Sequence, residues 1–163
     1  MDTYIVDTSP FVGLAKVGLL SILTVGGREV VVPDEVAREV LAGAAEDAAK
    51  QALREGWGVR AATGALPPAL AALRLGAGEA AVLAVALARS GSIAVMDDSE
   101  GRAVARELGV PVMGTVGVLL RAKQQGHLAA VAPAVRALQS TGLFLPKAGL
   151  LQTLLAAVGE TWP

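Results

Sequence analysis

The 163-residue sequence contains no cysteine and only one histidine, His127. The missing cysteine excludes disulfides, thiol nucleophiles and cysteine-ligated zinc or iron–sulfur sites. A single histidine cannot build a site with several histidine ligands, and a Ser-His-Asp triad would depend on it alone. If the chain is an enzyme, its catalysis must therefore rest on carboxylates, hydroxyls, lysines, arginines or Tyr4.

Neither sign of charge dominates the sequence, which has 14 basic and 15 acidic residues and a formal net charge of -1. A chain with this balance has no global positive field that attracts nucleic acid. Contact with RNA or DNA must then come from a local basic patch or from bound metal. Aromatic residues make up only 3% of the chain, so few side chains are available to stack on bases.

Long apolar runs are also missing. The longest uncharged stretches, such as AGLLQTLLAAVG near the end, are about a dozen residues long, whereas a membrane-spanning helix needs roughly 20. The N-terminus carries Asp2 and lacks the basic region that opens a secretory signal. We therefore expect a cytoplasmic protein that enters no membrane.

Short apolar runs, by contrast, recur along a chain that is 53% hydrophobic. Because they are apolar throughout rather than alternating, they favour strands of a parallel sheet that is covered on both faces. The sequence predicts a single α/β domain over residues 1–163, with a three-layer α/β/α architecture and a central, mainly parallel sheet. The predicted strands are 3–6, 29–32, 92–96 and 110–114, with an edge strand at 57–63.

Helical spacing of apolar residues fills the segments between these runs. The segment 11–23 has this spacing, but Gly13 and Gly18 are expected to break it. The segment 64–73 is expected to be a loop, because it contains two adjacent prolines. Further helices are predicted at 33–41, 45–56, 76–91, 99–109, 115–126, 128–141 and 146–158.

Carboxylates directly follow two of the predicted strands. Asp7 ends the first strand, and Asp97 and Asp98 end the strand at 92–96. Because active sites of open parallel sheets lie outside the carboxyl ends of the strands, neighbouring strands would bring these acids together. A structural alternative is that Asp7 and Asp98 cap the helices that follow them, which leaves Asp97 unexplained.

Three glutamates lie on helices beside these strand ends. Glu79 falls in the first turn of the helix before the 92–96 strand, where the helix dipole alone favours a negative charge. Glu35 and Glu39 are four residues apart and therefore share one helix face. A pairing with Arg38 or Arg54 would make them part of an ordinary solvated surface.

Several carboxylates at one edge of a sheet repel each other strongly when they are partly buried. A hard divalent cation removes this repulsion, and Mg²⁺ and Mn²⁺ prefer oxygen ligands. With no cysteine and one histidine, such a site is nearly the only metal chemistry open to the chain. Attack of metal-activated water on a phosphodiester is the natural reaction of such a site.

Four segments carry these acids in a recognisable order. They are IVDTSP with Asp7, VPDEVAREVL with Glu39, LGAGEAAVLAVALA with Glu79, and IAVMDDSEGRAVARELGVPVMGTVGVLLRAKQQG with Asp97 and Asp98. Their order and spacing resemble the PIN domain, a group of small metal-dependent nucleases. More specifically, the chain looks like the PIN branch that has the signature MDD-x-x-GR-x-x-A-x-x-LG-x-x-x-x-GT-x-G-x-L. The likeness continues through GLFLPKAGLLQTLLAAVGE and so covers nearly the whole chain.

The resemblance implies a nuclease that holds Mg²⁺ or Mn²⁺ and cleaves single-stranded RNA with metal-activated water. Ser9 matches the hydroxyl that often follows the first acid, and Glu39 is preferred to Glu35 because the family acid lies near the end of its segment. Carried over by position, the catalytic acids are Asp7, Glu39, Glu79 and Asp98. The implied metal ligands are Asp7, Glu79, Asp97 and Asp98, with the last two left as alternatives.

Many proteins of this family are toxins, each neutralised by a small antitoxin whose peptide enters the active-site groove, and dimers are usual. The resemblance thus implies an endoribonuclease toxin, a possible antitoxin partner and a homodimer. The alternative is a catalytically weak module that binds RNA or protein. Phosphotransfer domains and D-x-D phosphatases are disfavoured, because Asp7 is the only acid at the end of the first strand and Ser9 stands where a second Asp is needed.

Basic and hydroxyl side chains near the acids give further candidates for supporting the site. Arg102 is expected to touch a phosphate of the substrate or to pair with the adjacent acids. Thr115 is expected to cap a helix near the site. Lys16 and Lys123 either line the substrate groove or are solvated, and the solvated alternative is preferred.

Overall fold

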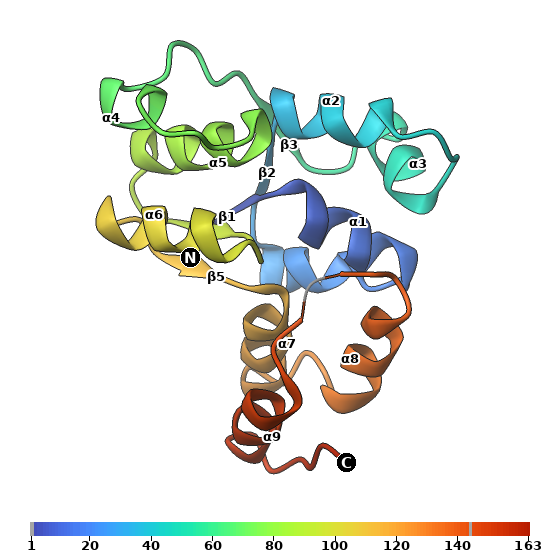
Figure 1. Ribbon diagram of the computed structural model, residues 1–163. Coiled ribbons are helices and arrows are strands. Elements are labelled where there is room, and N and C mark those ends of the chain that lie inside the picture. The colour runs from blue at the N-terminus through green and yellow to red at the C-terminus, as the bar shows by residue number, and fades with distance from the viewer. Residues whose placement is uncertain (1, 144) are drawn as a thin grey trace.

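The computed structural model describes residues 2–143 and 145–163, within which five strands form one sheet in the order β3-β2-β1-β4-β5 (Figure 1). All four neighbouring pairs are parallel. Helices flank the sheet, so the predicted three-layer α/β/α class is confirmed. The strands are β1 Thr3–Val6, β2 Val30–Pro33, β3 Val59–Ala61, β4 Ser92–Val95 and β5 Val112–Met113.

Helices connect the strands and cover the sheet. Helix α5 contacts β1, β2 and β4, and α2 packs against α5. Figure 1 shows α7, α8 and α9 gathered at one end of the molecule. The helices are α1 Thr8–Lys16, the 3₁₀ helix η1 Leu20–Gly27, α2 Asp34–Ala42, α3 Ala48–Arg54, α4 Pro68–Ala71, α5 Ala77–Ala88, α6 Ser99–Glu107, α7 Thr115–Gln124, α8 Ala132–Gln139 and α9 Ala148–Ala156.

The inner strands are apolar because both of their faces are covered. All four residues of β2 are buried, as are three of the four in β1 and in β4. The edge strand β3 is mostly exposed instead, which agrees with the predicted edge position of 57–63. This burial pattern is what a parallel sheet between two helical layers requires.

The strand order reverses at β1, and this reversal locates the site. From β1 the chain builds outward through β2 to β3, and β4 then pairs with the other side of β1. The carboxyl ends of β1 and β4 are in register, with Val6 opposite Val95 and the Asp7 N–H donating to the Val95 carbonyl at 2.9 Å. Such a reversal in strand order is where open parallel sheets bind their ligands.

Two helical predictions need correction. The expected break at Gly13 does not occur, because Gly13 lies inside α1. The break at Gly18 does occur, since Gly18 takes a φ of +71° and the chain continues as the 3₁₀ helix η1. The expected loop at 64–73 contains the short helix α4, whose first residue is a proline and therefore needs no N–H partner.

The C-terminal helices are shorter than their apolar patterns predict. Helix α8 begins at Ala132 rather than near 128, because the Glu160 carboxylate accepts hydrogen bonds from the N–H groups of Val131 and Ala132. The first N–H groups of a helix have no partner within it, and here the Glu160 carboxylate supplies one.

Among the described residues, no single helix has both the length and the apolar composition to cross a membrane. Helices α1 and η1 meet those criteria only as a pair, and the chain bends by 99° between them.

Candidate metal centre

Four carboxylates line a small pocket at the carboxyl ends of β1 and β4. Asp7 follows β1, Asp97 and Asp98 lie just beyond β4, and Glu79 lies in the first turn of α5. The pocket, here called the acidic pocket, has a volume of about 250 Å³ and is lined by Asp7, Ser9, Glu79, Asp97, Asp98 and Ser99. Chain segments that are far apart in the sequence therefore bring these acids to one place.

Asp7 is both a helix cap and a buried member of this pocket. Its Oδ1 accepts a hydrogen bond from the Thr8 N–H at 2.8 Å, so it caps α1. Burial raises the pKa of Asp7 to about 7. The nearby charges of Glu79, Glu39 and Asp97 also raise this pKa, while the bond from Thr8 opposes them.

Glu79 shares the electrostatic environment of Asp7 but is less buried. Burial raises its pKa, and the negative charges of Asp98, Glu39 and Glu100 raise it further, whereas a backbone hydrogen bond at Gly76 opposes the shift. Because each negative charge disfavours ionisation of its neighbours, having several of these carboxylates ionised at once is energetically unfavourable without a cation.

Asp97 is held at the start of α7. Its Oδ1 accepts from the Thr115 N–H at 2.8 Å, and its Oδ2 accepts from the Thr115 hydroxyl at 2.5 Å. Burial raises the pKa of Asp97, although these two bonds and the positive charge of Arg102 lower it. A Cβ at Gly114 would lie 3.0 Å from the Asp97 Oδ1 and in collision with Arg102. Because Gly114 has no side chain, Asp97 and Arg102 can both pack against its backbone.

Asp98 is the cap of the helix that follows β4. Its Oδ2 accepts from the Gly101 N–H at 2.7 Å, while the side chain stays exposed at the mouth of the acidic pocket. Asp97 and Asp98 thus differ: the first is buried and anchored to α7, and the second is exposed and anchored to its own helix.

The two glutamates of α2 are separated by their partners. Glu39 binds the Thr8 hydroxyl at 2.6 Å and the Gly78 N–H at 2.9 Å, which places it between the first turns of α1 and α5. Glu35 accepts from the Thr63 hydroxyl at 2.5 Å and lies 3.9 Å from Arg38. Of the two, Glu39 is the one that adjoins the acidic pocket.

Two residues of the site, Ser99 and Gly78, are not among the predicted ones. Ser99 lines the acidic pocket, and Gly78 gives Glu39 room, since a Cβ there would lie 2.7 Å from the Glu39 Oε1. A glycine inside the first turn of a helix, where alanine is more stable, was the available signal for such close packing. One prediction is wrong: Thr115 is expected to cap a helix, but Gly114 is the capping residue of α7 and Thr115 is its first helical residue.

The remaining candidates occupy different places. Arg102 is near enough to Asp97 for its charge to lower the pKa of that carboxyl, but the two form no ion pair or hydrogen bond in the described part of the chain. Ser9 is exposed on the rim of the acidic pocket. Lys123 is away from it and binds Glu160 at 2.7 Å.

The donor set suits a hard divalent cation in its chemistry. Every titratable side chain that lines the acidic pocket is a carboxylate, and burial together with like charge raises the pKa of both Asp7 and Glu79. In the described part of the chain, however, no three histidine, aspartate or glutamate side chains converge closely enough to enclose a metal ion. Mg²⁺ fits such an open arrangement because it keeps several waters and needs only one or two carboxylates.

Comparison with protein families agrees with this geometry. No curated protein is similar enough in sequence to match the chain. A family model described as DUF3368: PIN domain matches residues 3–160, which include every acid of the pocket. PIN domains are generally nucleases, and they typically use divalent metal ions. The matched span, the parallel sheet and the carboxylates at its switch point agree with one another, and the chain belongs to the PIN-domain family.

Proposed function

We propose that the protein is a Mg²⁺- or Mn²⁺-dependent endoribonuclease that cleaves single-stranded RNA. The observation that carries this proposal is the acidic pocket at the switch point of the sheet, where Asp7, Glu79, Asp97 and Asp98 meet. When bound, a divalent ion would lower the pKa of a coordinated water and stabilise the negative charge that develops on the phosphodiester oxygens.

The residues of the chain divide the remaining work. Asp7, Glu79 and Asp98 present carboxylate oxygens toward the pocket, and Asp97 is oriented for the same purpose by Thr115. In most metal sites, neighbouring residues donate hydrogen bonds to the ligating carboxylates and so fix their orientation. Glu39 keeps the first turns of α1 and α5 together and adds negative charge beside Asp7.

A toxin of a toxin–antitoxin pair is the biological setting that we propose for this activity, with the protein acting as a homodimer. The support is the family resemblance of the sequence, in which antitoxin peptides enter the groove that holds the acids. Co-purification of the protein with a small partner encoded beside it is the test of this setting.

Exchange of Asp7 for asparagine tests the proposed activity most directly. Asp7→Asn keeps the shape of the side chain and its ability to cap α1 but removes the charge. We expect the rate at which the protein cleaves a fluorescent single-stranded RNA with Mn²⁺ to fall by more than about 100-fold. This loss is larger than the one usual for residues that only hydrogen-bond to a metal ligand. A chelator should abolish cleavage by the wild type.

Glu55→Gln is the matched control, because Glu55 is an exposed carboxylate that follows the last residue of α3, and its side chain binds only Gln51 among the described residues. Its cleavage rate should equal that of the wild type, and circular dichroism should show both variants folded. Equal cleavage by Asp7→Asn and the wild type would contradict the assignment of the site.

A catalytically weak module that binds RNA or protein is the second candidate. The observation that favours it is the spacing of the described carboxylates, which do not close around an ion. Titration calorimetry separates the two: the nuclease binds Mn²⁺ at millimolar concentration or below, whereas a folded protein that releases no heat with Mn²⁺ supports the second candidate.

A further inference from the structure

One face of α1 is open to solvent at both of its ends. Ser9 and Lys16 are exposed and Val12 is half-buried, whereas Gly13 is buried, as are Pro10, Phe11, Leu14 and Ala15. Residues 9, 12, 13 and 16 are spaced three and four apart, so they lie along a single face. That face begins at the acidic pocket with Ser9 and ends about two helical turns later with Lys16.

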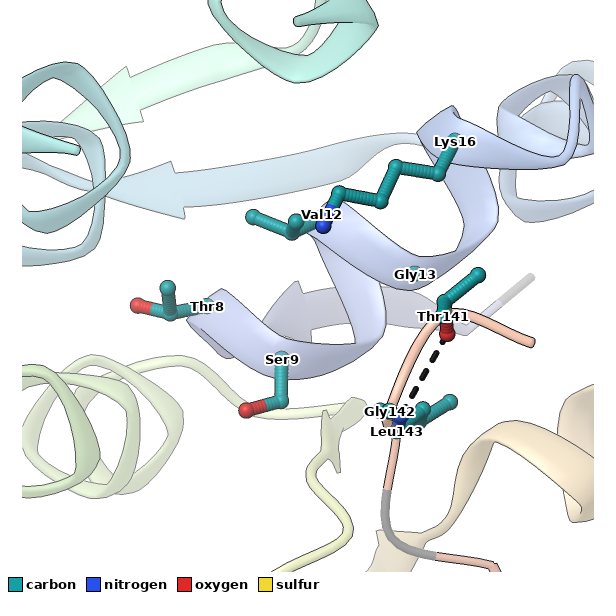
Figure 2. Close-up of a pocket in the computed structure, with 8 residues that line it drawn as sticks. All are labelled: Thr8, Ser9, Val12, Gly13, Lys16, Thr141, Gly142 and Leu143. Atoms are coloured by element: carbon teal, nitrogen blue, oxygen red, sulfur yellow. Dashed lines mark hydrogen bonds between the residues drawn. The ribbon is translucent and has the colours of Figure 1, made fainter. Parts of the chain in front are cut away.

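This face forms one wall of a second pocket, here called the Lys16 pocket. It has a volume of about 210 Å³ and is shown in Figure 2. In the figure, the Lys16 side chain runs back along α1 toward Val12, and the segment 141–143 passes beside Gly13. The lining residues are Thr8, Ser9, Val12, Gly13, Lys16, Thr141, Gly142 and Leu143.

The opposite wall of the Lys16 pocket is held by hydrogen bonds. The Thr141 hydroxyl donates to the Leu138 carbonyl at 2.7 Å. It also accepts from the Leu143 N–H at 3.3 Å, the bond that is dashed in Figure 2. The wall lies close to α1, since a Cβ at Gly13 would approach the Leu143 Cδ2 to 3.2 Å. The pocket is therefore bounded by a helix on one side and a tethered turn on the other.

The Lys16 pocket and the acidic pocket are neighbours, because Ser9 lines both. A third pocket of about 440 Å³ shares Asp97 and Ser99 with the acidic pocket and carries Arg102 and Arg106. The acidic pocket thus adjoins two pockets that contain positive charge.

This order of charges suits a polyanion that passes through the acidic pocket. The carboxylates repel phosphates, so a strand that reaches them gains from a cation placed just outside. Among the described residues, no carboxylate lies within ion-pair distance of Lys16. Its charge is available to a ligand, and the exposed Ser9 lies in the lining between Lys16 and the acidic pocket.

We propose that single-stranded RNA crosses Ser9 from the acidic pocket into the Lys16 pocket, where Lys16 binds the phosphate of a nucleotide beside the cleaved bond. This inference rests on the proposed nuclease function. It assigns substrate binding to a pocket and a lysine for which the sequence pattern alone favours simple solvation.

Binding of RNA without cleavage tests the inference. Asp7→Asn prevents turnover, so we compare it with the double variant Asp7→Asn/Lys16→Ala by fluorescence anisotropy of a labelled single-stranded RNA in magnesium buffer. Lys16→Ala should weaken binding about three- to tenfold at low salt. It should also lower the slope of log K against log salt by about 0.7, the contribution of one phosphate contact to a single strand.

Arg89→Ala is the matched control for the loss of one exposed positive charge. Arg89 caps the far end of α5, away from Glu79, and its ion pair with Glu29 is exposed. Binding and salt slope should be unchanged by this substitution. In the cleaving wild-type background, Lys16→Ala should raise KM with little change in kcat, as loss of a contact common to substrate and transition state does.

The outcomes separate this inference from the function on which it rests. Absence of metal-dependent cleavage by the wild type, with anisotropy still sensitive to Lys16, rejects the nuclease and retains the RNA path. An affinity and salt slope that are unchanged by Lys16→Ala overturn the path. So does the absence of any RNA binding by the Asp7→Asn parent.

Discussion

At the scale of single residues, the acidic pocket stores unfavourable electrostatic energy. Asp7 is only 6% exposed and faces the charges of Glu79, Glu39 and Asp97. An ordinary aspartate has a pKa of 3.8, and burial raises that of Asp7 to about 7. The group would therefore hold its proton in the folded chain at pH values where the unfolded chain has lost it.

This shift predicts a stability that depends on pH in the metal-free protein. Well below pH 3.8, Asp7 is protonated in both the folded and the unfolded state, and its ionisation does not affect stability. As the pH rises from about 4 to about 7, ionisation is easier in the unfolded chain, so the free energy of unfolding falls by an amount on the order of 4 kcal/mol. Above pH 7, the full cost is present.

Asp7→Asn removes this titration. With chelator present, urea unfolding should show the variant to be more stable than the wild type at pH 8, with the difference shrinking as the pH falls and disappearing below about pH 3. Added Mn²⁺ should reverse the order at pH 8, because the ion binds only the ionised wild type and stabilises its folded state. A constant difference across the pH range would show that Asp7 does not carry the raised pKa.

At the scale of elements, the contact between α2 and α5 positions the site. Glu39 of α2 binds the N–H of Gly78 in the first turn of α5, and a Cβ at Gly78 would lie 2.7 Å from the Glu39 Oε1, so a side chain fits there only if the carboxylate moves. Gly149 occupies a similar place in α9, but nothing lies within 4 Å of a Cβ built there. The two glycines thus have different reasons to be glycine.

Alanine substitution separates these reasons. Gly149→Ala should stabilise the protein by up to about 1 kcal/mol, because alanine restricts the unfolded chain and favours helix. Gly78→Ala should destabilise it by about 1–2 kcal/mol, since the new methyl group displaces the Glu39 carboxylate from its hydrogen bonds.

Urea unfolding of both variants measures the difference, and Mn²⁺ titration of Gly78→Ala should show weaker binding. Equal effects of the two substitutions would mean that the close approach of Glu39 to α5 is not maintained in solution.

At the scale of the whole molecule, the last residues of the chain hold the C-terminal helices together. The Glu160 carboxylate, which follows α9, accepts hydrogen bonds at the start of α8, from the N–H of the capping residue Val131 at 2.8 Å and from the N–H of the first helical residue Ala132 at 2.9 Å. It also binds Lys123 of α7. Burial acts to raise the pKa of Glu160, but these bonds outweigh it and the pKa is lowered.

Glu160→Ala should lower the free energy of unfolding by about 1–3 kcal/mol, because it leaves the N-terminus of α8 without its acceptor. Since the pKa of Glu160 is lowered in the folded state, this stabilisation is present above the ordinary pKa of 4.5 and fades as the pH falls below it. Thermal unfolding of the variant and the wild type at pH 7 and at pH 3 measures the loss of stability and its dependence on pH.

Glu160→Ala should leave Mn²⁺ binding intact, because the acidic pocket contains no residue of this cluster. Loss of Mn²⁺ binding together with stability would contradict the separation of the C-terminal cluster from the site.

Much of this molecule follows from local pattern. Apolar runs without alternation specify buried parallel strands, because only strands covered on both faces can be apolar throughout. Acids that end such runs must lie at the same edge of the sheet, since all strands point the same way. This reasoning predicts the fold class, and the convergence of Asp7 with Asp97 and Asp98, before any tertiary contact is known.

Other features depended on contacts between distant segments. Glu35 and Glu39 share a helix face, so spacing cannot tell which adjoins the site, and only the packing of α2 on α5 decides for Glu39. The bonds from Thr115 to Asp97 likewise arise because β4 and β5 are neighbours. Local sequence thus determined which residues end strands and begin helices, while tertiary packing decided which of them meet, because a hydrogen-bond partner 18 or 39 residues away leaves no periodic signal in the chain.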